Sequence, residues 1–129
     1  MATVTALETT EIGMAPGCYL TLRREAAGLT IEQLARRSAL PLRVAELLSD
    51  AEADRVFLPR GVLSWLAGFI HIDAEVYGCL VALIPAGRIC VGCGCTWNDA
   101  CWTAHGPCGW STITNDFDVC TACTGELGR

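Results

Sequence analysis

Residues 22–35 read LRREAAGLTIEQLA, and this stretch decides the fold of the N-terminal half of the chain. Gly28 stands where a glycine commonly ends a helix, so the pattern predicts a first helix that stops just before it. Thr30 and Gln33 have the spacing of a capping box, in which each side chain caps the backbone N–H of the other residue. A second helix is therefore predicted over residues 31–38.

Proline and aspartate predict where three further helices begin. Pro41 and Pro59 can each occupy a first turn, and Asp73 can cap the helix that follows it. Apolar residues recur at intervals of three and four through these segments, as in amphipathic helices. The five predicted helices span residues 18–27, 31–38, 42–49, 60–68 and 74–83. Their inward residues are predicted to be Leu22, Ala26, Leu29, Leu34, Ala35, Val44, Leu47, Leu48, Val62, Leu63, Leu66, Val76, Tyr77 and Leu80.

The first two predicted helices resemble the opening of lambda-repressor-like (Cro/repressor-type) helix-turn-helix domains, and the later helices suit that five-helix fold. The resemblance implies that the third helix enters the DNA major groove while the second lies across the backbone. Two departures stand out. Ile31 occupies a position where many family members place a phosphate-contacting glutamine, although Gln33 is close by. Residues 38–40 carry no glycine in the turn.

A DNA-binding transcriptional regulator is the first function that this resemblance implies. The predicted third helix offers one good donor, Arg43, whereas Glu46 and Asp50 would repel phosphates. A homodimer reading two half-sites is expected for such a domain. The predicted nucleic-acid contacts are Arg23, Arg24, Gln33, Arg36, Arg37 and Arg43.

Charge keeps a second function open. The formal net charge is −5, and all nine basic residues are arginines, so the chain lacks the overall positive field that drives non-specific DNA binding. Leu42, Leu47 and Leu48 on the predicted third helix would suit a protein interface if exposed. The alternative is a non-enzymatic interaction module, for example an inhibitor or adaptor docking on a host protein.

Two Cys-x-x-Cys pairs bracket residues 90–123. Two intervening residues let both thiolates reach one ion, and two such pairs form a four-sulfur zinc site. The first predicted site therefore comprises Cys90, Cys93, Cys120 and Cys123. Twenty-six residues separate the pairs, more than the roughly 15–20 of a common zinc ribbon.

The segment between the pairs holds further ligand-type residues. Cys95, Cys101, Cys108 and His105 are candidates for a second zinc site. Other interpretations stay open: buried thiols acting as small apolar residues, disulfides in an oxidising compartment, or an iron–sulfur cluster.

The whole cysteine-rich segment resembles one found in bacterial and phage proteins, some of them plasmid-partition-like or helix-turn-helix proteins. The matching motifs are CVGCGCT at residues 90–96, Ala-Cys at 100–101, PCGW at 107–110 and DVCTAC at 118–123. The resemblance implies metal binding and a phage or mobile-element context, and it implies no activity.

The 129 residues divide by composition into a flexible tail (1–15), a helix-turn-helix helical domain (16–85) and a cysteine-rich zinc module (86–129). The last segment is expected to be irregular or β-rich, zinc-ribbon-like or treble-clef-like. Its roughly 40 residues give a thin core, which favours stabilisation by metal. Its aromatic and apolar candidates are Trp97, Trp102, Trp110, Ile113 and Phe117.

Several classes of protein are not expected. The first ten residues lack a basic region followed by an apolar region, which predicts a cytoplasmic protein with reduced thiols. The longest apolar run, residues 76–84, is too short for a membrane span. The sequence carries no phosphate loop and no His-Glu-x-x-His, so an enzyme is not expected.

Overall fold

The computed structural model describes residues 14–96, 99–103, 106–110 and 119–124. The chain divides into two compact units, Met1–Ala86 and Gly87–Arg129, one residue from the predicted boundary. Most of the described first unit is helical, whereas the described part of the second unit has little regular structure and a cluster of cysteines. The predicted flexible tail falls almost wholly outside the described residues.

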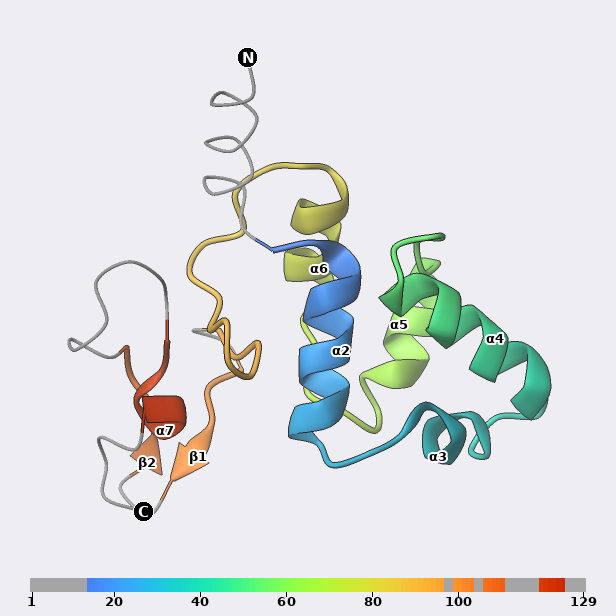
Figure 1. Ribbon diagram of the computed structural model, residues 1–129, viewed down its shortest axis with the longest axis horizontal. Coiled ribbons are helices and arrows are strands. Elements are labelled where there is room, and N and C mark those ends of the chain that lie inside the picture. The colour runs from blue at the N-terminus through green and yellow to red at the C-terminus, as the bar shows by residue number, and fades with distance from the viewer. Residues whose placement is uncertain (1–13, 97–98, 104–105, 111–118, 125–129) are drawn as a thin grey trace. The chain divides into compact units, whose positions relative to one another are not determined.

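The first unit contains five described helices, which Figure 1 labels α2 to α6. Three of them begin where capping chemistry predicts: the Thr30–Gln33 box has both hydrogen bonds, Pro41 lies in a first turn, and Asp73 accepts the N–H groups of Glu75 and Val76. Helix α2 begins two residues before the predicted start, and Pro59 lies just before α5, at its N-cap. The helices are α2 (Pro16–Ala26), α3 (Ile31–Ala35), α4 (Pro41–Glu52), α5 (Arg60–Leu66) and α6 (Ala74–Val81).

The end of α2 confirms the predicted glycine cap. Gly28 has φ +72°, the left-handed region in which glycine is favoured. Its N–H donates to the Glu25 carbonyl at 2.9 Å, and the Leu29 N–H donates to the Arg24 carbonyl at 3.3 Å. These two bonds form a Schellman motif, which satisfies the last carbonyls of the helix and turns the chain toward α3.

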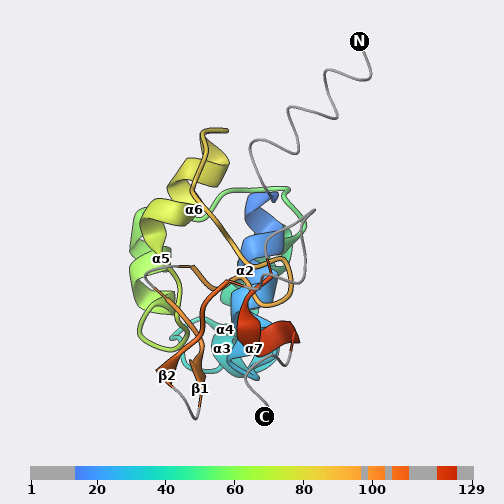
Figure 2. The ribbon, with the colours of Figure 1, turned by 90° about the vertical axis from the view of Figure 1, so that its left-hand side faces the viewer.

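Helix α4 is longer than predicted, because residues 50–52 continue it instead of forming a connector. Its C-terminal turn lies against the start of α2, where a Cβ on Gly17 would stand 2.3 Å from the Glu52 carbonyl oxygen. Only glycine permits that approach, and the Gly17 N–H donates to the Asp54 carboxylate at 2.8 Å. Helix α2 contacts both α4 and α6, and Figure 2 shows α2 beside α6.

The core of the first unit agrees with the predicted inward face for α3 and α6 and differs for α2. Leu34, Ala35, Val76, Tyr77 and Leu80 are buried, as predicted. In α2 the predicted face was wrong, because Ala26 is exposed. Tyr19 and Leu20 are buried there instead.

The described part of the second unit contains a two-stranded antiparallel hairpin, β1 (Trp102–Thr103) with β2 (Gly106–Pro107), and one short helix, α7 (Thr121–Thr124). An isolated antiparallel bridge joins Trp110 to Cys120. The buried cluster of the second unit is built mainly of cysteines: Cys90, Cys95 and Cys120, with Val119. A core made of thiols is small and needs further stabilisation.

Candidate metal centre

The first Cys-x-x-Cys pair lies in a tight loop that hydrogen bonds close on themselves. The Cys90 N–H donates to the Cys95 carbonyl at 3.0 Å, and the Gly94 N–H donates to the Cys90 carbonyl at 2.8 Å. Gly94 has φ +78°, which glycine adopts without a steric penalty. The loop also aims the Gly92 N–H at the Cys90 sulfur, 3.3 Å away. Such N–H groups stabilise a thiolate, the form that binds metal.

The second pair belongs to the start of α7. Cys120 lies just before the helix, and its N–H donates to the Cys90 sulfur at 3.3 Å. The Cys123 N–H donates to the Cys120 carbonyl at 3.1 Å, so both side chains project from one turn. Thr121 fixes this turn against residue 109, whose N–H donates to the Thr121 hydroxyl at 3.0 Å.

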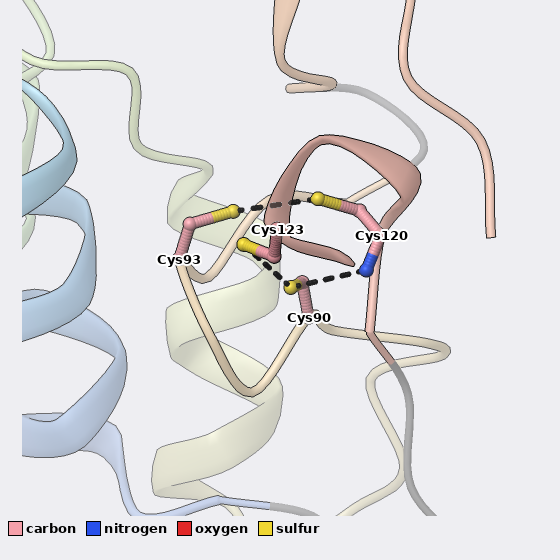
Figure 3. Close-up of side chains that lie close together, drawn as sticks. All are labelled: Cys90, Cys93, Cys120 and Cys123. Carbon is pink, nitrogen blue, oxygen red and sulfur yellow. Dashed lines mark hydrogen bonds between the residues drawn. The ribbon is translucent and has the colours of Figure 1, made fainter. Parts of the chain in front are cut away.

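The four predicted ligands of the first site converge (Figure 3). The Sγ atoms of Cys90, Cys93, Cys120 and Cys123 all lie within 4.8 Å of one another. The Cys90–Cys123 sulfurs are 3.6 Å apart and the Cys93–Cys120 sulfurs 3.9 Å apart. A tetrahedral zinc with Zn–S bonds of about 2.3 Å requires sulfurs about 3.8 Å apart. The donor set therefore fits a zinc-type four-thiolate site, as the sequence predicted.

The inner cysteines form a second group that overlaps the first. Cys93, Cys95, Cys101 and Cys120 also lie within 4.8 Å of one another. The Cys93–Cys101 sulfurs are 3.5 Å apart. Two of these four residues were predicted only for the first site, so among the described residues the inner cysteines group with the first site and not as the separate cluster that the sequence predicted.

The other two predicted ligands of a second site are placed differently. Cys108 lies 3.8 Å, sulfur to sulfur, from Cys95, and its sulfur accepts the Cys101 N–H at 3.2 Å. His105 lies outside the described residues. Cys108 therefore lies next to the inner group, but its sulfur is not one of the four that are mutually close.

Burial and crowding shape the protonation of these thiols. Hydrogen bonds from the Cys93 and Cys95 side chains lower the pKa of Cys90. Desolvation, followed by the bond to Cys93, raises the pKa of Cys101 to about 12. Several thiolates cannot share so small a volume without a compensating cation, because each raises the pKa of its neighbours. A divalent ion would remove that conflict and hold all of the sulfurs deprotonated.

The sulfur distances bear on the alternative interpretations. All nine cysteines are free, and the close pairs at 3.5–3.9 Å are well beyond the S–S bond of about 2.05 Å. An iron–sulfur cluster places several irons and sulfides between its thiolates, which holds the thiolates farther apart than a single ion does. The packed sulfurs therefore suit metal ions bound directly by the thiolates better than a cluster that contains inorganic sulfide.

Among the described residues of this unit, one aromatic side chain packs against the cysteine core. Of the predicted aromatic and apolar core candidates, Trp110 is the one whose side chain is described. The Arg88 guanidinium lies over its ring, 4.3 Å from the centroid, in a cation–π contact. Trp97, Ile113 and Phe117 lie outside the described residues, and so does the side chain of Trp102.

Two of the predicted nucleic-acid contacts in the first unit point inward. Arg23 is 6% exposed, and its Nε donates to the His71 carbonyl at 2.7 Å. Arg24 forms a two-point ion pair with Glu52, with Nε–Oε2 2.7 Å and Nη2–Oε1 2.9 Å. Both guanidinium groups therefore join elements of the fold together, and neither is presented for a phosphate. The sequence prediction for Arg23 and Arg24 is corrected accordingly.

The remaining predicted contacts lie on the surface of α3, the turn after it and the start of α4. Arg36, Arg37 and Arg43 are exposed. Gln33 is exposed too, and its side-chain oxygen accepts the Thr30 N–H while its NH₂ group stays available for a further acceptor. The Arg37 guanidinium also lies 5.1 Å from the centroid of the Phe69 ring.

Large apolar side chains flank this surface. Leu40 is 61% exposed and Leu42 88% exposed, at the turn before α4 and in its first turn. Leu47 is half-buried and Leu48 buried, so neither is open to a partner as the sequence suggested. Sequence reasoning missed Leu40, because the length of a turn does not show which of its residues face the core.

Comparisons with protein-family models, curated proteins and solved structures find no match for this chain. Within the described part of the chain, no helix is long and apolar enough to cross a membrane.

Proposed function

We propose that the second unit is a structural zinc module, with Cys90, Cys93, Cys120 and Cys123 as the ligands of its first ion. The mutual approach of these four sulfurs to within 4.8 Å carries the proposal. The order of a cysteine loop, a hairpin and a helix with the second pair supports the treble-clef-like alternative. A closed four-thiolate site has no open coordination position, which supports a non-enzymatic role.

Zinc would supply much of the folding free energy of this module. Apparent binding free energies of structural zinc are about 10–16 kcal/mol at neutral pH. The buried cluster described in this unit consists of three cysteines and one valine, with Trp110 and Ala122 partly buried against it, which gives little hydrophobic stabilisation in comparison. Because thiolates must stay reduced to bind zinc, we place the protein in the cytoplasm.

For the first unit we propose a lambda-repressor-like helix-turn-helix domain that binds DNA, with α4 as the reading helix. Gln33, Arg36, Arg37 and Arg43 are exposed on α3, the turn after it and the start of α4, which supports this assignment. Arg43 is the single basic residue of α4 and the best candidate for a base contact. A transcriptional regulator of phage or mobile-element origin, acting as a homodimer, is the function that we propose.

Because Arg23 and Arg24 make their contacts within the fold, few arginines remain for phosphates, and the DNA proposal predicts a definite salt dependence of binding. With Arg43 at a base, Arg36 and Arg37 neutralising two phosphates give a slope of log K against log salt of about −2 per protomer. Selection from a pool of random-sequence duplexes at low salt, followed by mobility shifts over a salt series, tests this. The matched variants are Arg43→Ala and Arg60→Ala, because Arg60 is exposed at the start of α5.

The DNA proposal predicts that Arg43→Ala weakens binding about tenfold and relaxes the selected sequence at one position, whereas Arg60→Ala leaves affinity and sequence preference unchanged. Equal effects of the two substitutions on DNA binding, or a selection that enriches no sequence, would contradict the DNA proposal.

The exposure of Leu40 and Leu42 favours a second candidate function, docking on a protein partner. Base readout uses polar donors, and two exposed leucines at the tip of the reading helix suit an apolar partner surface better. Leu42→Ser separates the two functions. A docking module loses its partner with this variant and tolerates Arg43→Ala, whereas a DNA-binding domain shows the reverse pattern.

A further inference from the structure

Cys93 and Cys120 belong to both groups of mutually close sulfurs. Their Sγ atoms, 3.9 Å apart, form one edge of the four-sulfur group that Cys90 and Cys123 complete. The same two sulfurs form an edge of the group that Cys95 and Cys101 complete. Two overlapping groups of this kind describe two tetrahedra that share an edge.

The number of cysteines also requires sharing if two ions bind through sulfur alone. Two separate four-thiolate sites need eight cysteines, and the second unit has seven. Sharing two thiolates lowers the requirement to six. It also leaves less uncompensated negative charge on the buried sulfurs of Cys90, Cys95 and Cys120, and isolated charge in such surroundings is costly.

We propose that the second unit holds a dinuclear zinc–thiolate cluster in which Cys93 and Cys120 bridge the two ions. Cys90 and Cys123 are the terminal ligands of the first ion, and Cys95 and Cys101 those of the second. The proposal rests on the zinc module proposed above and adds a second ion to it.

The backbone brings the second pair of terminal ligands to the shared edge. The left-handed turn at Gly94 lets Cys95 follow Cys93 and bury its sulfur on the same cluster. Cys101 reaches Cys93 at 3.5 Å from the start of the hairpin. The Cys108 N–H donates to the Cys101 carbonyl at 2.8 Å, which fixes the position of that ligand.

Cys108 is the seventh cysteine, and the proposal assigns it to the surroundings of the cluster. Its sulfur accepts the Cys101 N–H and lies against Cys95, but it is not among the four inner sulfurs that are mutually close. In this position Cys108 holds the backbone of Cys101, a proposed ligand of the second ion. Because Cys108 is a cysteine of the same unit that binds no ion in this proposal, its substitution is the control for the substitutions of the proposed ligands.

The decisive experiment counts ions and detects the bridge in the full chain. The protein is purified under reducing, oxygen-free conditions, saturated with zinc, desalted and weighed by native mass spectrometry. The cluster predicts two zinc ions per chain. Substitution with ¹¹³Cd then tests the bridge, because scalar coupling between two cadmium nuclei passes through a shared sulfur and is not expected between ions at separate sites.

Four variants complete the test. Cys95→Ala and Cys101→Ala are expected to retain one ion, whereas Cys108→Ala and His105→Ala retain two. Two ions without ¹¹³Cd coupling, with one lost in Cys108→Ala or His105→Ala, would show separate sites and overturn the cluster. One ion in the unaltered chain would also overturn the cluster and leave the first zinc site standing. No ion at all would overturn both proposals.

Discussion

Gly92→Ala is the smallest change that tests the first metal site. A Cβ at this position would lie 2.9 Å from the Cys123 sulfur, 3.3 Å from the Cys123 Cβ and 3.6 Å from the Cys90 sulfur. Carbon and sulfur in ordinary contact are about 3.5–4.0 Å apart, so Cys123 must move by about 0.6 Å or more. Structural metal–ligand distances tolerate about 0.2 Å, and the displaced thiolate therefore cannot keep its bond unstrained.

Relief of this overpacking costs about 1–3 kcal/mol, as for an added methyl in a packed core. Since 1.4 kcal/mol is tenfold, the dissociation constant of the first zinc should rise by about fivefold to 150-fold. Competition with a chromophoric chelator measures it. Gly109→Ala is the matched control, because nothing lies within 4 Å of its added Cβ. Equal zinc affinity in the two variants would refute the placement of Cys123 beside Cys90.

Three further predictions concern metal removal and the stability of the helical unit. Chelation should abolish the near-UV circular dichroism of the second unit and leave most of the helical far-UV signal, because five of the described helices belong to the first unit. Intact near-UV signal after complete zinc removal would contradict a metal-dependent fold. Arg24→Ala should lower the free energy of urea unfolding by about 2–3 kcal/mol, because it strands the largely buried carboxylate of Glu52. Arg55→Ala, which breaks an exposed ion pair, should cost less than about 1 kcal/mol. Equal losses of stability in the two variants would contradict this expectation. Burial raises the pKa of Tyr77, so the folded state favours the neutral phenol and stability should fall as pH rises above about 10. Chemical denaturation from pH 8 to 11 tests this, with Tyr77→Phe expected to flatten the decline.

The sequence predicted features that local chemistry determines. The capping box at Thr30 and Gln33, the glycine end of α2 and the cap at Asp73 all involve residues within a few positions of one another, and the structure confirms them. The convergence of the two Cys-x-x-Cys pairs was also predictable, because that motif has few other uses in a chain without disulfides.

Features that depend on distant partners were not predictable. An arginine such as Arg23 is expected at the surface from residue type alone. Its burial is accompanied by a hydrogen bond to the carbonyl of His71, forty-eight positions away. The last residue of α4, Glu52, likewise pairs with Arg24, twenty-eight positions away. The overlap of the two cysteine groups arises from the folding of the inner loop, which the spacing of cysteines alone does not determine.

Zinc K-edge X-ray absorption of the zinc-loaded chain tests the central claim most directly, that cysteine thiolates of residues 90–123 hold zinc. A site built from Cys90, Cys93, Cys120 and Cys123 predicts four sulfur neighbours at about 2.3 Å for each bound zinc. The same first shell is expected whether one ion binds or two. A shell dominated by nitrogen or oxygen at about 2.0–2.1 Å would contradict the account.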